Sequence, residues 1–292
     1  MKAIETCGLT KYYGKNRGIE DLNLQVETGE FLGCVGPNGA GKSTTIRTLL
    51  GLISPTSGSA SLLGIDISRR EEILRRVGYL PSETVFYSGM KVRDVLKMSA
   101  DLRGVDCSRE TAQLCERLQL DAGKKVETLS FGNRKKVGVV CALQHRPELL
   151  ILDEPTGGLD PLMQRELFDI LQERNREGTT VFLSSHVLSE IQRYCTRAAI
   201  LRAGRMIACD RVEALASTNA KRVTVHGAVD LTGLQGVRDW KSGEEGARFL
   251  YSGEMPQLLQ HLAAGQVTDL SITEPDLEEV FLHYYQKGAE EV

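Results

Sequence analysis

The sequence predicts an α/β fold with alternating strands and helices, followed by a small α+β domain. Two observations favour the first part. The apolar run Phe31–Val35 leads through a glycine-rich segment into the helical spacing of Thr45–Gly51. Leu149–Leu152 is apolar throughout, as expected of a central strand in a parallel sheet. A third observation marks the second part, because from about Ala220 the sequence changes to short strand-like runs.

The glycine-rich segment Gly36–Thr44 fits G-x-x-x-x-G-K-[ST], the pattern of a phosphate-binding loop. Glycines let the backbone curl so that several N–H groups face one anion, and the start of the following helix adds more unpaired N–H groups. Lys42 can then reach the β- and γ-phosphates of a nucleotide, and the Ser43 hydroxyl can bind Mg²⁺. The alternative is a glycine-rich turn before an ordinary helix, which the preceding strand and the following helix disfavour.

Length and composition are those of a soluble globular protein. The chain has 292 residues, 41% hydrophobic and 26% charged, enough for one large domain or two of ordinary size. The net charge of −3 gives no electrostatic argument for binding nucleic acid or an anionic membrane. No apolar run approaches the roughly 18 residues of a transmembrane helix, and the N-terminus lacks the apolar core of a signal peptide. Seven cysteines without a C-x-x-C pair favour free thiols in a reducing cytosol over a metal site.

The first 30 residues are predicted to form strands, because Ile4–Leu9 and Leu22–Val26 alternate apolar and polar residues. Tyr12 and Tyr13 lie between these two runs. An aromatic side chain exposed on a loop before a phosphate site can stack on an adenine ring. A tyrosine packed at the end of a strand fits the same pattern equally well.

The middle of the chain is predicted to be mostly helical. A loop that carries Phe86, Tyr87 and Met90 interrupts it. The expected elements are a strand at 59–63, a helix at 70–77, a strand at 77–80, the loop at 82–91 and helices at 92–102 and 108–120.

A further helix is expected to begin in the segment Thr128–Lys136 and to run to His145, before Pro147. Ser130 and Gly132 stand at its start, where a hydroxyl and free N–H groups can bind an anion. Taken alone, an ordinary serine N-cap explains this segment better.

Two acidic residues, Asp153 and Glu154, follow the apolar strand Leu149–Leu152. Ligands of open α/β sheets bind at this carboxyl end of the strands. Asp153 can hold Mg²⁺, and Glu154 can polarise a water for attack on a γ-phosphate. The alternative is a polar turn after a strand, which the phosphate-loop pattern earlier in the chain disfavours.

A second β-rich run, Thr179–Ser185, ends at His186. A single histidine is more often structural than catalytic, but this one follows another candidate central strand, as Asp153 and Glu154 do. Helices are expected at 162–176 and 188–195, and a hairpin at 198–208.

The C-terminal part is predicted to contain strands at 223–226, 248–251 and 267–272 and a helix at 255–264. A last helix is expected to begin near Pro275. It carries an apolar stripe at helical spacing that fits the packing face of a small α+β domain better than an oligomer contact: Leu277, Val280, Phe281 and Tyr284.

The order of these motifs resembles the ATPase subunit of ABC transporters over about residues 1–215. The motifs that carry the resemblance are Gly36–Thr44, Leu129–Arg134, Leu149–Glu154, Gly158–Asp160 and His186. The resemblance implies an α/β phosphate-loop NTPase core with an antiparallel β subdomain and a helical subdomain at about 82–145. It places one domain at 1–217 and an accessory domain at 218–292. The segment Glu274–Phe281 is similar to the accessory domain of ABC-2-type exporters, including antibiotic-resistance and self-immunity exporters.

The resemblance also implies a role for each site residue. Tyr13 would stack on adenine, with Tyr12 as a rival. Asp153 would bind Mg²⁺ together with Ser43, Glu154 would be the general base, and His186 would contact the γ-phosphate. ATP would lie between two subunits, where Asp160 links the sites and Ser130 and Gly132 contact the γ-phosphate of the partner. The phosphates would be held by Gly36, Asn38, Gly39, Gly41, Lys42, Ser43 and Thr44.

Two motifs depart from the family pattern. The family usually has a glutamine that reaches Mg²⁺ and the attacking water where this chain has Ser82. The serine side chain is too short to reach Mg²⁺ in the same way. A bridging water or the neighbouring Glu83 would have to take the place of the glutamine. In the segment Leu129–Arg134, which corresponds to the family's signature segment, Phe131 and Asn133 replace a glycine and a glutamine.

The resemblance therefore implies an ATP-hydrolysing subunit, peripheral on the cytoplasmic side of the membrane, that powers export through a separate transmembrane permease. ATP and Mg²⁺ are the expected cofactors, and a second ATPase subunit, in a homodimer, is the expected partner. No nucleic-acid partner is expected. The alternatives are an ATP-binding sensor with little hydrolysis and a soluble ABC ATPase that acts on nucleic acid or ribosomes.

Overall fold

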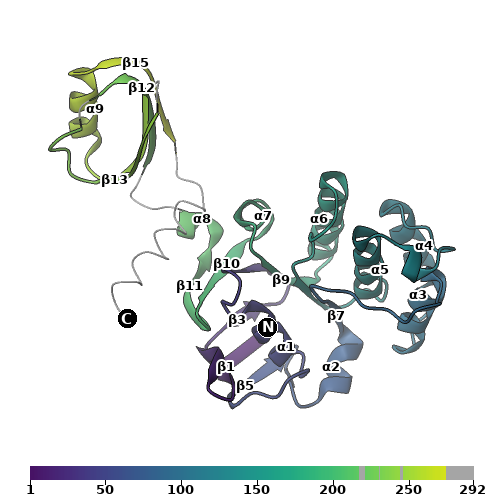
Figure 1. Ribbon diagram of the computed structural model, residues 1–292. Helices are drawn as coiled ribbons and strands as arrows, with labels where there is room; N and C mark the ends of the chain where they lie inside the picture. Colours follow the sequence, from purple (N-terminus) through teal and green to yellow (C-terminus); the bar gives the residue numbers. More distant parts are fainter. Residues whose placement is uncertain (217–220, 230, 244–245, 274–292) are drawn as a thin grey trace. The chain divides into compact units, whose positions relative to one another are not determined.

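The computed structural model describes residues 1–216, 221–229, 231–243 and 246–273 (Figure 1). The chain divides into two compact units, Met1–Cys209 and Asp210–Val292. The domain boundary predicted at 217/218 adjoins 217–220, which lie outside the described residues, so it stays a prediction. No helix in the described ranges is both long and apolar enough to cross a membrane.

Six strands form the central sheet of the first unit, in the order β11-β10-β4-β9-β8-β7. The five strands from β10 to β7 run parallel. Both faces of β4, β8 and β9 are buried, which explains why apolar and polar residues do not alternate along them. The strands are β4 (Phe31–Val35), β7 (Val77–Leu80), β8 (Leu149–Asp153), β9 (Thr180–Ser185), β10 (Arg197–Arg202) and β11 (Arg205–Arg211).

Helices cover both faces of this sheet. In Figure 1, α6 and α7 lie on one side of the sheet, and α1, α2 and the antiparallel sheet lie on the other. Ile46 of α1 packs into the same core as Leu32 and Phe182 of the sheet. The helices are α1 (Lys42–Leu49), α2 (Arg70–Arg76), α6 (Pro161–Arg176) and α7 (Leu188–Tyr194). The predicted α/β fold class is confirmed.

A second sheet of the first unit is antiparallel. Its strand order is β2-β1-β5-β6, and β3 also pairs with β1. The strands are β1 (Lys2–Tyr13), β2 (Asn16–Leu22), β3 (Gln25–Glu27), β5 (Ser57–Leu62) and β6 (Ile65–Asp66).

The single strand predicted at 22–26 is wrong. Leu22 ends β2, and β3 begins at Gln25. Side chains interrupt the ladder here, because Thr6 Oγ1 donates to the Leu22 carbonyl at 2.7 Å and accepts from the Leu24 N–H at 2.7 Å. The Asn23 amide oxygen accepts from the Gly8 N–H at 2.8 Å. These bonds satisfy backbone groups without a continuous strand.

The helical part of the first unit packs beside β7 and α6 (Figure 1). Ion pairs join α4 to α6: Arg117 pairs with Glu166, at 2.7 Å from its Nε, and with Glu173. Arg174 pairs with the buried Glu110. The helices are α3 (Val92–Asp101), α4 (Ser108–Arg117), the 3₁₀ turn η1 (Val126–Thr128) and α5 (Phe131–Leu143).

In its described residues, the second unit contains an antiparallel sheet in the order β13-β14-β12-β15 and two helices. Val223 and Phe249 of the sheet form its core with Leu258 of α9. The sequence analysis missed β13 because its side chains are largely exposed and show no apolar alternation. The predicted last helix, with Leu277, lies outside the described residues. The elements are α8 (Val212–Ala216), β12 (Lys221–Ala228), β13 (Val237–Gly243), β14 (Gly246–Tyr251), α9 (Met255–Ala263) and β15 (Gln266–Thr273).

Candidate functional site

The predicted site residues follow three neighbouring strands of the central sheet. β4 leads into the phosphate-loop segment, β8 ends at Asp153, and β9 lies between them and leads to His186. The register pairs Val35 with Ser185 and Asp153 with Ser184, so the three strands end level with one another. The segments that follow them therefore meet at one edge of the sheet.

The phosphate-loop segment requires its glycines. Gly39 has φ 81° and Gly41 has φ 105°, conformations that residues with a side chain rarely adopt. A Cβ at Gly36 would lie 2.3 Å from the Leu201 carbonyl oxygen. Lys42 is buried and donates to the Gly36 carbonyl at 2.7 Å, which folds its ammonium group back over the loop. The loop thus places a lysine ammonium and the N-terminus of α1 together, which suits the binding of phosphates.

Asp153 is fully buried at the end of β8. Its Oδ1 accepts a hydrogen bond from Ser184 Oγ at 2.5 Å, whereas Oδ2 has no hydrogen-bond partner among the described residues. A buried carboxylate oxygen without a donor is costly unless a cation or water binds it. This oxygen fits the prediction that Asp153 takes part in holding Mg²⁺.

Glu154 connects Lys42 to His186. Its Oε1 lies 3.5 Å from Lys42 Nζ, and its Oε2 lies 2.5 Å from His186 Nδ1. The backbone of Glu154 is unusual, with φ 50°, and its N–H donates to Ser184 O at 3.1 Å. This backbone hydrogen bond fixes Glu154 at the edge of the sheet. The His186 imidazole, in contrast, is 62% exposed. The structure brings together three predicted site residues that are far apart in the sequence.

Ser82 lies in the loop after β7, and its carbonyl oxygen accepts from Lys135 Nζ at 2.9 Å. The same ammonium donates to Asp153 O at 3.4 Å. Burial lowers the pKa of Lys135 to about 8, although Asp153 and Glu154 oppose this effect. The sequence analysis missed Lys135, because a lysine in a helix is normally exposed to solvent. The only sequence signal was its position just after the Ser130–Asn133 segment.

The predicted partner-facing residues form a separate group. Ser130 caps α5, where its Oγ accepts from the Asn133 N–H at 3.3 Å, as the simpler interpretation expected. Asp160 caps α6 by accepting from Leu162 N and Met163 N at 3.1 Å each. Within the described part of the chain, no hydrogen bond or ion pair joins Ser130, Gly132 or Asp160 to Lys42, Glu154 or His186.

A close contact joins the start of α5 to the segment before Asp160. A Cβ at Gly132 would lie 2.4 Å from the Gly158 carbonyl oxygen. A Cβ at Gly158, which has φ 79°, would lie 2.2 Å from the Phe131 ring. The two segments are therefore positioned by each other, and Phe131 takes part in this contact while remaining 50% exposed.

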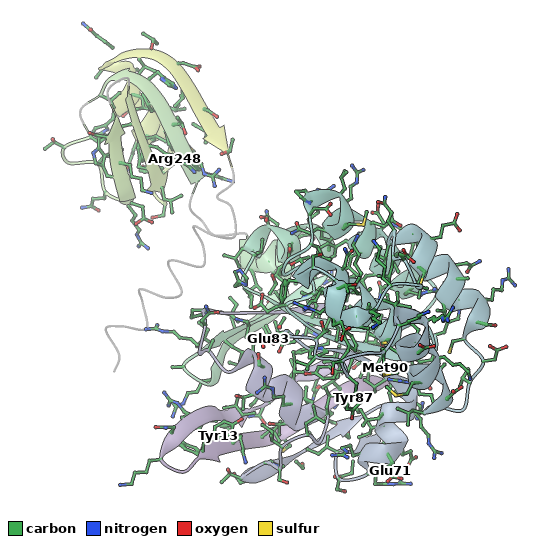
Figure 2. All side chains as sticks on the ribbon, turned by 45° about the vertical axis from the view of Figure 1, so that its right-hand side comes forward. Tyr13, Glu71, Glu83, Tyr87, Met90 and Arg248 are labelled. Carbon is green, nitrogen blue, oxygen red and sulfur yellow. The ribbon has the colours of Figure 1, made fainter. Side chains whose placement is uncertain are left out.

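Tyr13 and Tyr12 differ in their surroundings. Tyr13 ends β1 and is 46% exposed; Figure 2 shows it on the antiparallel sheet. The Tyr12 hydroxyl instead donates to Glu20 at 3.0 Å, and this hydrogen bond is the first cause of its raised pKa. Arg17 and Arg205 also hold Glu20. Tyr13 is thus the more exposed of the two tyrosines, although Lys11 Nζ lies over its ring at 5.4 Å from the centroid and the residue lies at a strand end rather than on a loop.

The loop at 82–91 borders a groove of about 330 Å³, lined by residues 83–88 with Val126, Glu127, Phe131 and Arg134. Figure 2 labels Glu83, Tyr87 and Met90 in this region. Tyr87 is exposed, whereas Phe86 and Met90 are half-buried. Met90 is held inward because its carbonyl accepts from Val126 N at 3.0 Å. Val85 of the same loop is also exposed.

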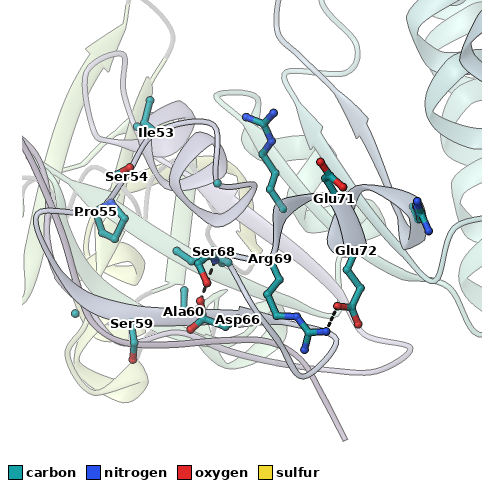
Figure 3. Close-up of a pocket in the computed structure, with 15 residues that line it drawn as sticks. Ile53, Ser54, Pro55, Ser59, Ala60, Asp66, Ser68, Arg69, Glu71 and Glu72 are labelled. Atoms are coloured by element: carbon teal, nitrogen blue, oxygen red, sulfur yellow. Dashed lines mark hydrogen bonds and ion pairs between the residues drawn. The ribbon is translucent and has the colours of Figure 1, made fainter. Parts of the chain in front are cut away.

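A larger groove, of about 1040 Å³, lies between the C-terminal end of α1 and α2 (Figure 3). It contains none of the predicted site residues. Its lining has equal numbers of arginines and acidic residues, and Arg69 pairs with Glu72 at 2.5 Å. The groove therefore carries no net charge that would favour a phosphate.

The fold and the residues at the sheet edge define a phosphate-loop ATPase. The family model "ABC transporter" matches residues 19–157. YhaQ of Bacillus subtilis (strain 168), an uncharacterized ABC transporter ATP-binding protein, is 34% identical over 94% of this chain and 95% of its own length. The chain belongs to the ABC transporter ATP-binding proteins.

Two further comparisons agree with this family. The bacitracin transport ATP-binding protein BcrA of Bacillus licheniformis is 40% identical over 70% of this chain and 68% of BcrA. A solved structure described as the ATP binding subunit of an ABC transporter is 32% identical, with a TM-score of 0.70 over 73% of this chain and 91% of that chain.

Proposed function

We propose that the chain is the ATP-hydrolysing subunit of an exporter that works with a separate transmembrane permease, at the cytoplasmic side of the membrane. Family membership and the similarity to BcrA, a bacitracin transport protein, support export. The single observation that carries hydrolysis is the contact of Glu154 with both Lys42 and His186. The sensor and the nucleic-acid ATPase are disfavoured, because the relatives are transporter subunits.

The reaction is in-line attack of water on the γ-phosphate of ATP. Glu154 accepts a proton from the water, the water oxygen bonds to the γ-phosphorus, and the bond to the β-phosphate oxygen breaks to release ADP and phosphate. Lys42 and the phosphate-loop N–H groups bind the phosphate oxygens and stabilise their charge. His186 holds the Glu154 carboxylate toward the water. Tyr13 stacks on the adenine ring.

The residues that would hold Mg²⁺ are Ser43, Asp153 and Ser82. Asp153 supplies a buried carboxylate oxygen with no other partner among the described residues. When bound, the ion would neutralise charge on the phosphates. Because one carboxylate and two hydroxyls are a sparse ligand set, phosphate oxygens and water would complete the coordination.

We place the second half of the ATP site on a second copy of the chain. Ser130, Gly132 and Asp160 form a group apart from Lys42, and the N-terminus of α5 offers free N–H groups for the γ-phosphate of a partner. ATP would then join two subunits, and hydrolysis would release them.

The permease would dock in the groove beside the loop at 82–91. The exposed Val85 and Tyr87 rim this groove, and Phe131 connects it to the signature segment. An apolar segment of the permease is the occupant that this lining suits. Movement of the loop would displace Ser82.

The function is tested by replacing Glu154 with Gln, which keeps the size of the side chain but removes the base. Hydrolysis should fall by about 10²-fold or more, while ATP binding, measured separately, is retained. Glu71→Gln, at an exposed position on α2, is the matched control. Wild-type protein that binds ATP but never hydrolyses it, even with its permease, would favour the sensor instead.

The docking surface is tested by Tyr87→Glu. We expect weaker recruitment to membranes that contain the permease and loss of permease-stimulated hydrolysis, with basal hydrolysis unchanged. Leu102→Glu is the control, because Leu102 is equally exposed but lies after α3, outside the lining of the groove. Equal recruitment of the two variants would disprove docking at this groove.

A further inference from the structure

Lys135 lies one turn into α5 and is only 1% exposed. Its ammonium group donates to three backbone carbonyls: Pro81 at 3.0 Å, Ser82 at 2.9 Å and Asp153 at 3.4 Å. These carbonyls belong to the loop after β7 and to the end of β8. One side chain therefore connects three segments: the start of α5, the loop at Ser82 and the strand that presents the carboxylates.

This arrangement is costly, which indicates that it has a specific purpose. Removing an ammonium group from water costs several kcal/mol, and carbonyl oxygens repay only part of that cost. Lys135 makes no ion pair with a carboxylate among the described residues. An apolar side chain of similar length would fill the same space without this cost. What the lysine adds is three directed hydrogen bonds, which match its three N–H donors.

The link also bears on the departure at Ser82. A serine side chain is too short to connect the loop to the reacting groups as a glutamine would. The loop is instead held through its backbone, by the carbonyls of Pro81 and Ser82. The hydrogen bond to Asp153 O places the same ammonium at the end of β8, next to Glu154.

We propose that Lys135 is a positioning residue for ATP hydrolysis, which fixes the loop at Ser82 and the end of β8 to the start of α5. A shift of α5 then moves Ser82 and Asp153 together. The signature segment of this subunit is thereby coupled mechanically to the end of β8, where Asp153 and Glu154 of the same subunit lie. This inference rests on the proposed function, because it assigns Lys135 a part in the same reaction.

The neighbouring residue offers a matched control. Lys136 lies on the same helix and is also buried, at 8% exposed, but it makes no hydrogen bond or ion pair within the described ranges. Lys135→Met and Lys136→Met remove the same charge from adjacent positions. Only the first removes the link between the loop and β8.

The experiment compares the turnover number, the KM for ATP and the melting temperature of both variants in the full-length chain. Turnover is expressed per nucleotide-binding subunit, so that misfolded protein is not counted. We expect Lys135→Met to lower kcat about ten-fold with little change in KM, and Lys136→Met to leave kcat within about two-fold. Adding Ser82→Gln to Lys135→Met should restore part of the lost kcat, because a longer side chain can then position the loop. Equal kcat in the two single variants would overturn the proposal.

Amide hydrogen exchange provides a second measurement that does not depend on hydrolysis. Lys135→Met should speed exchange at residues 82–85, whereas exchange at residues 36–44 should stay unchanged. If exchange increases evenly over the whole first unit, Lys135 has only a general structural role and the proposal fails. If the wild type proves to be inactive but the local change in exchange is found, the link stands and the proposed function is what has failed.

Discussion

His186 Nδ1 lies 2.5 Å from Glu154 Oε2, and this contact joins the segments that follow two adjacent strands of the central sheet. The imidazole is mostly exposed, whereas the carboxylate is mostly buried. The other carboxylate oxygen lies near Lys42, at a distance too long for a strong hydrogen bond. A phosphate that binds Lys42 would compete for its ammonium, which would leave the histidine as the group that orients Glu154.

Replacing His186 with Ala should therefore reduce turnover more than binding. The carboxylate would keep its backbone anchor but lose the group that orients it, so we expect kcat to fall by about 10- to 100-fold with little change in the Kd for ATP. The measurement is steady-state phosphate release beside equilibrium nucleotide binding. His261→Ala on α9 is the control, since His261 is a half-buried histidine of the second unit and is not one of the predicted site residues. If both variants keep full turnover, His186 does not orient the base.

Gly132→Ala tests the contact between the signature segment and Gly158. The new methyl group would lie 2.4 Å from a backbone oxygen, so one of the two segments must shift. We expect a loss of about 1–3 kcal/mol in the free energy of unfolding, measured by urea denaturation, together with weaker ATP-driven dimerisation. In Gly123→Ala, the nearest atom is a flexible Asp121 side chain at 3.2 Å, so this variant should be near neutral. Equal stability of the two variants would mean that α5 starts with more room than the contact indicates.

The parts of the site that local sequence patterns define could be predicted from the sequence. Gly36–Thr44 has a fixed spacing, and Asp153 and Glu154 directly follow an apolar strand. The contact between Glu154 and His186 depends on β9 lying next to β8, which no local pattern encodes. The sequence could only place both residues at strand ends, and the strand order then brings them together. The roles assigned to these residues remain predictions.

The errors have a common physical cause, which is that side-chain hydrogen bonds override local patterns. The strand predicted at 22–26 is interrupted because Thr6 bonds to the backbone of Leu22 and Leu24, and Asn23 accepts from the Gly8 N–H of β1. Lys135 is an ordinary helix residue by sequence and becomes a buried link only because the Ser82 loop and the end of β8 pack against α5. Such contacts depend on tertiary structure.

Tyr13→Ala should weaken nucleotide binding, because the exposed ring is the surface on which a base would stack. The loss of one stacking contact is worth about 1–3 kcal/mol, which predicts an increase of about 5- to 150-fold in the Kd for ATP. Tyr13→Trp should bind ATP as well as the wild type does. Tyr12→Phe removes only the hydrogen bond to Glu20 and should leave the Kd unchanged. A larger effect of Tyr12→Phe than of Tyr13→Ala would reverse the assignment.

His145 should make the first unit sensitive to acid. It follows α5, and burial is the main cause that lowers its pKa from 6.5 to about 4, with the charge of Arg103 as a second cause. The unfolded chain therefore binds more protons than the folded chain between these two pH values, so stability falls as the pH drops from about 6.5 to 4. At 1.36 kcal/mol per pKa unit, this loss amounts to about 3 kcal/mol at most.

The measurement is the free energy of unfolding at several pH values, for the wild type and for His145→Gln. Carboxyl groups titrate over the same range in both proteins, so the difference between the two curves isolates the histidine. As the pH falls from 6.5 to 4, the free energy of unfolding of the wild type should fall relative to that of His145→Gln. Above pH 7 the two curves should run parallel. His261→Gln on α9 should follow the wild type throughout. Parallel curves for His145→Gln down to pH 4 would show that the imidazole reaches water in the folded protein.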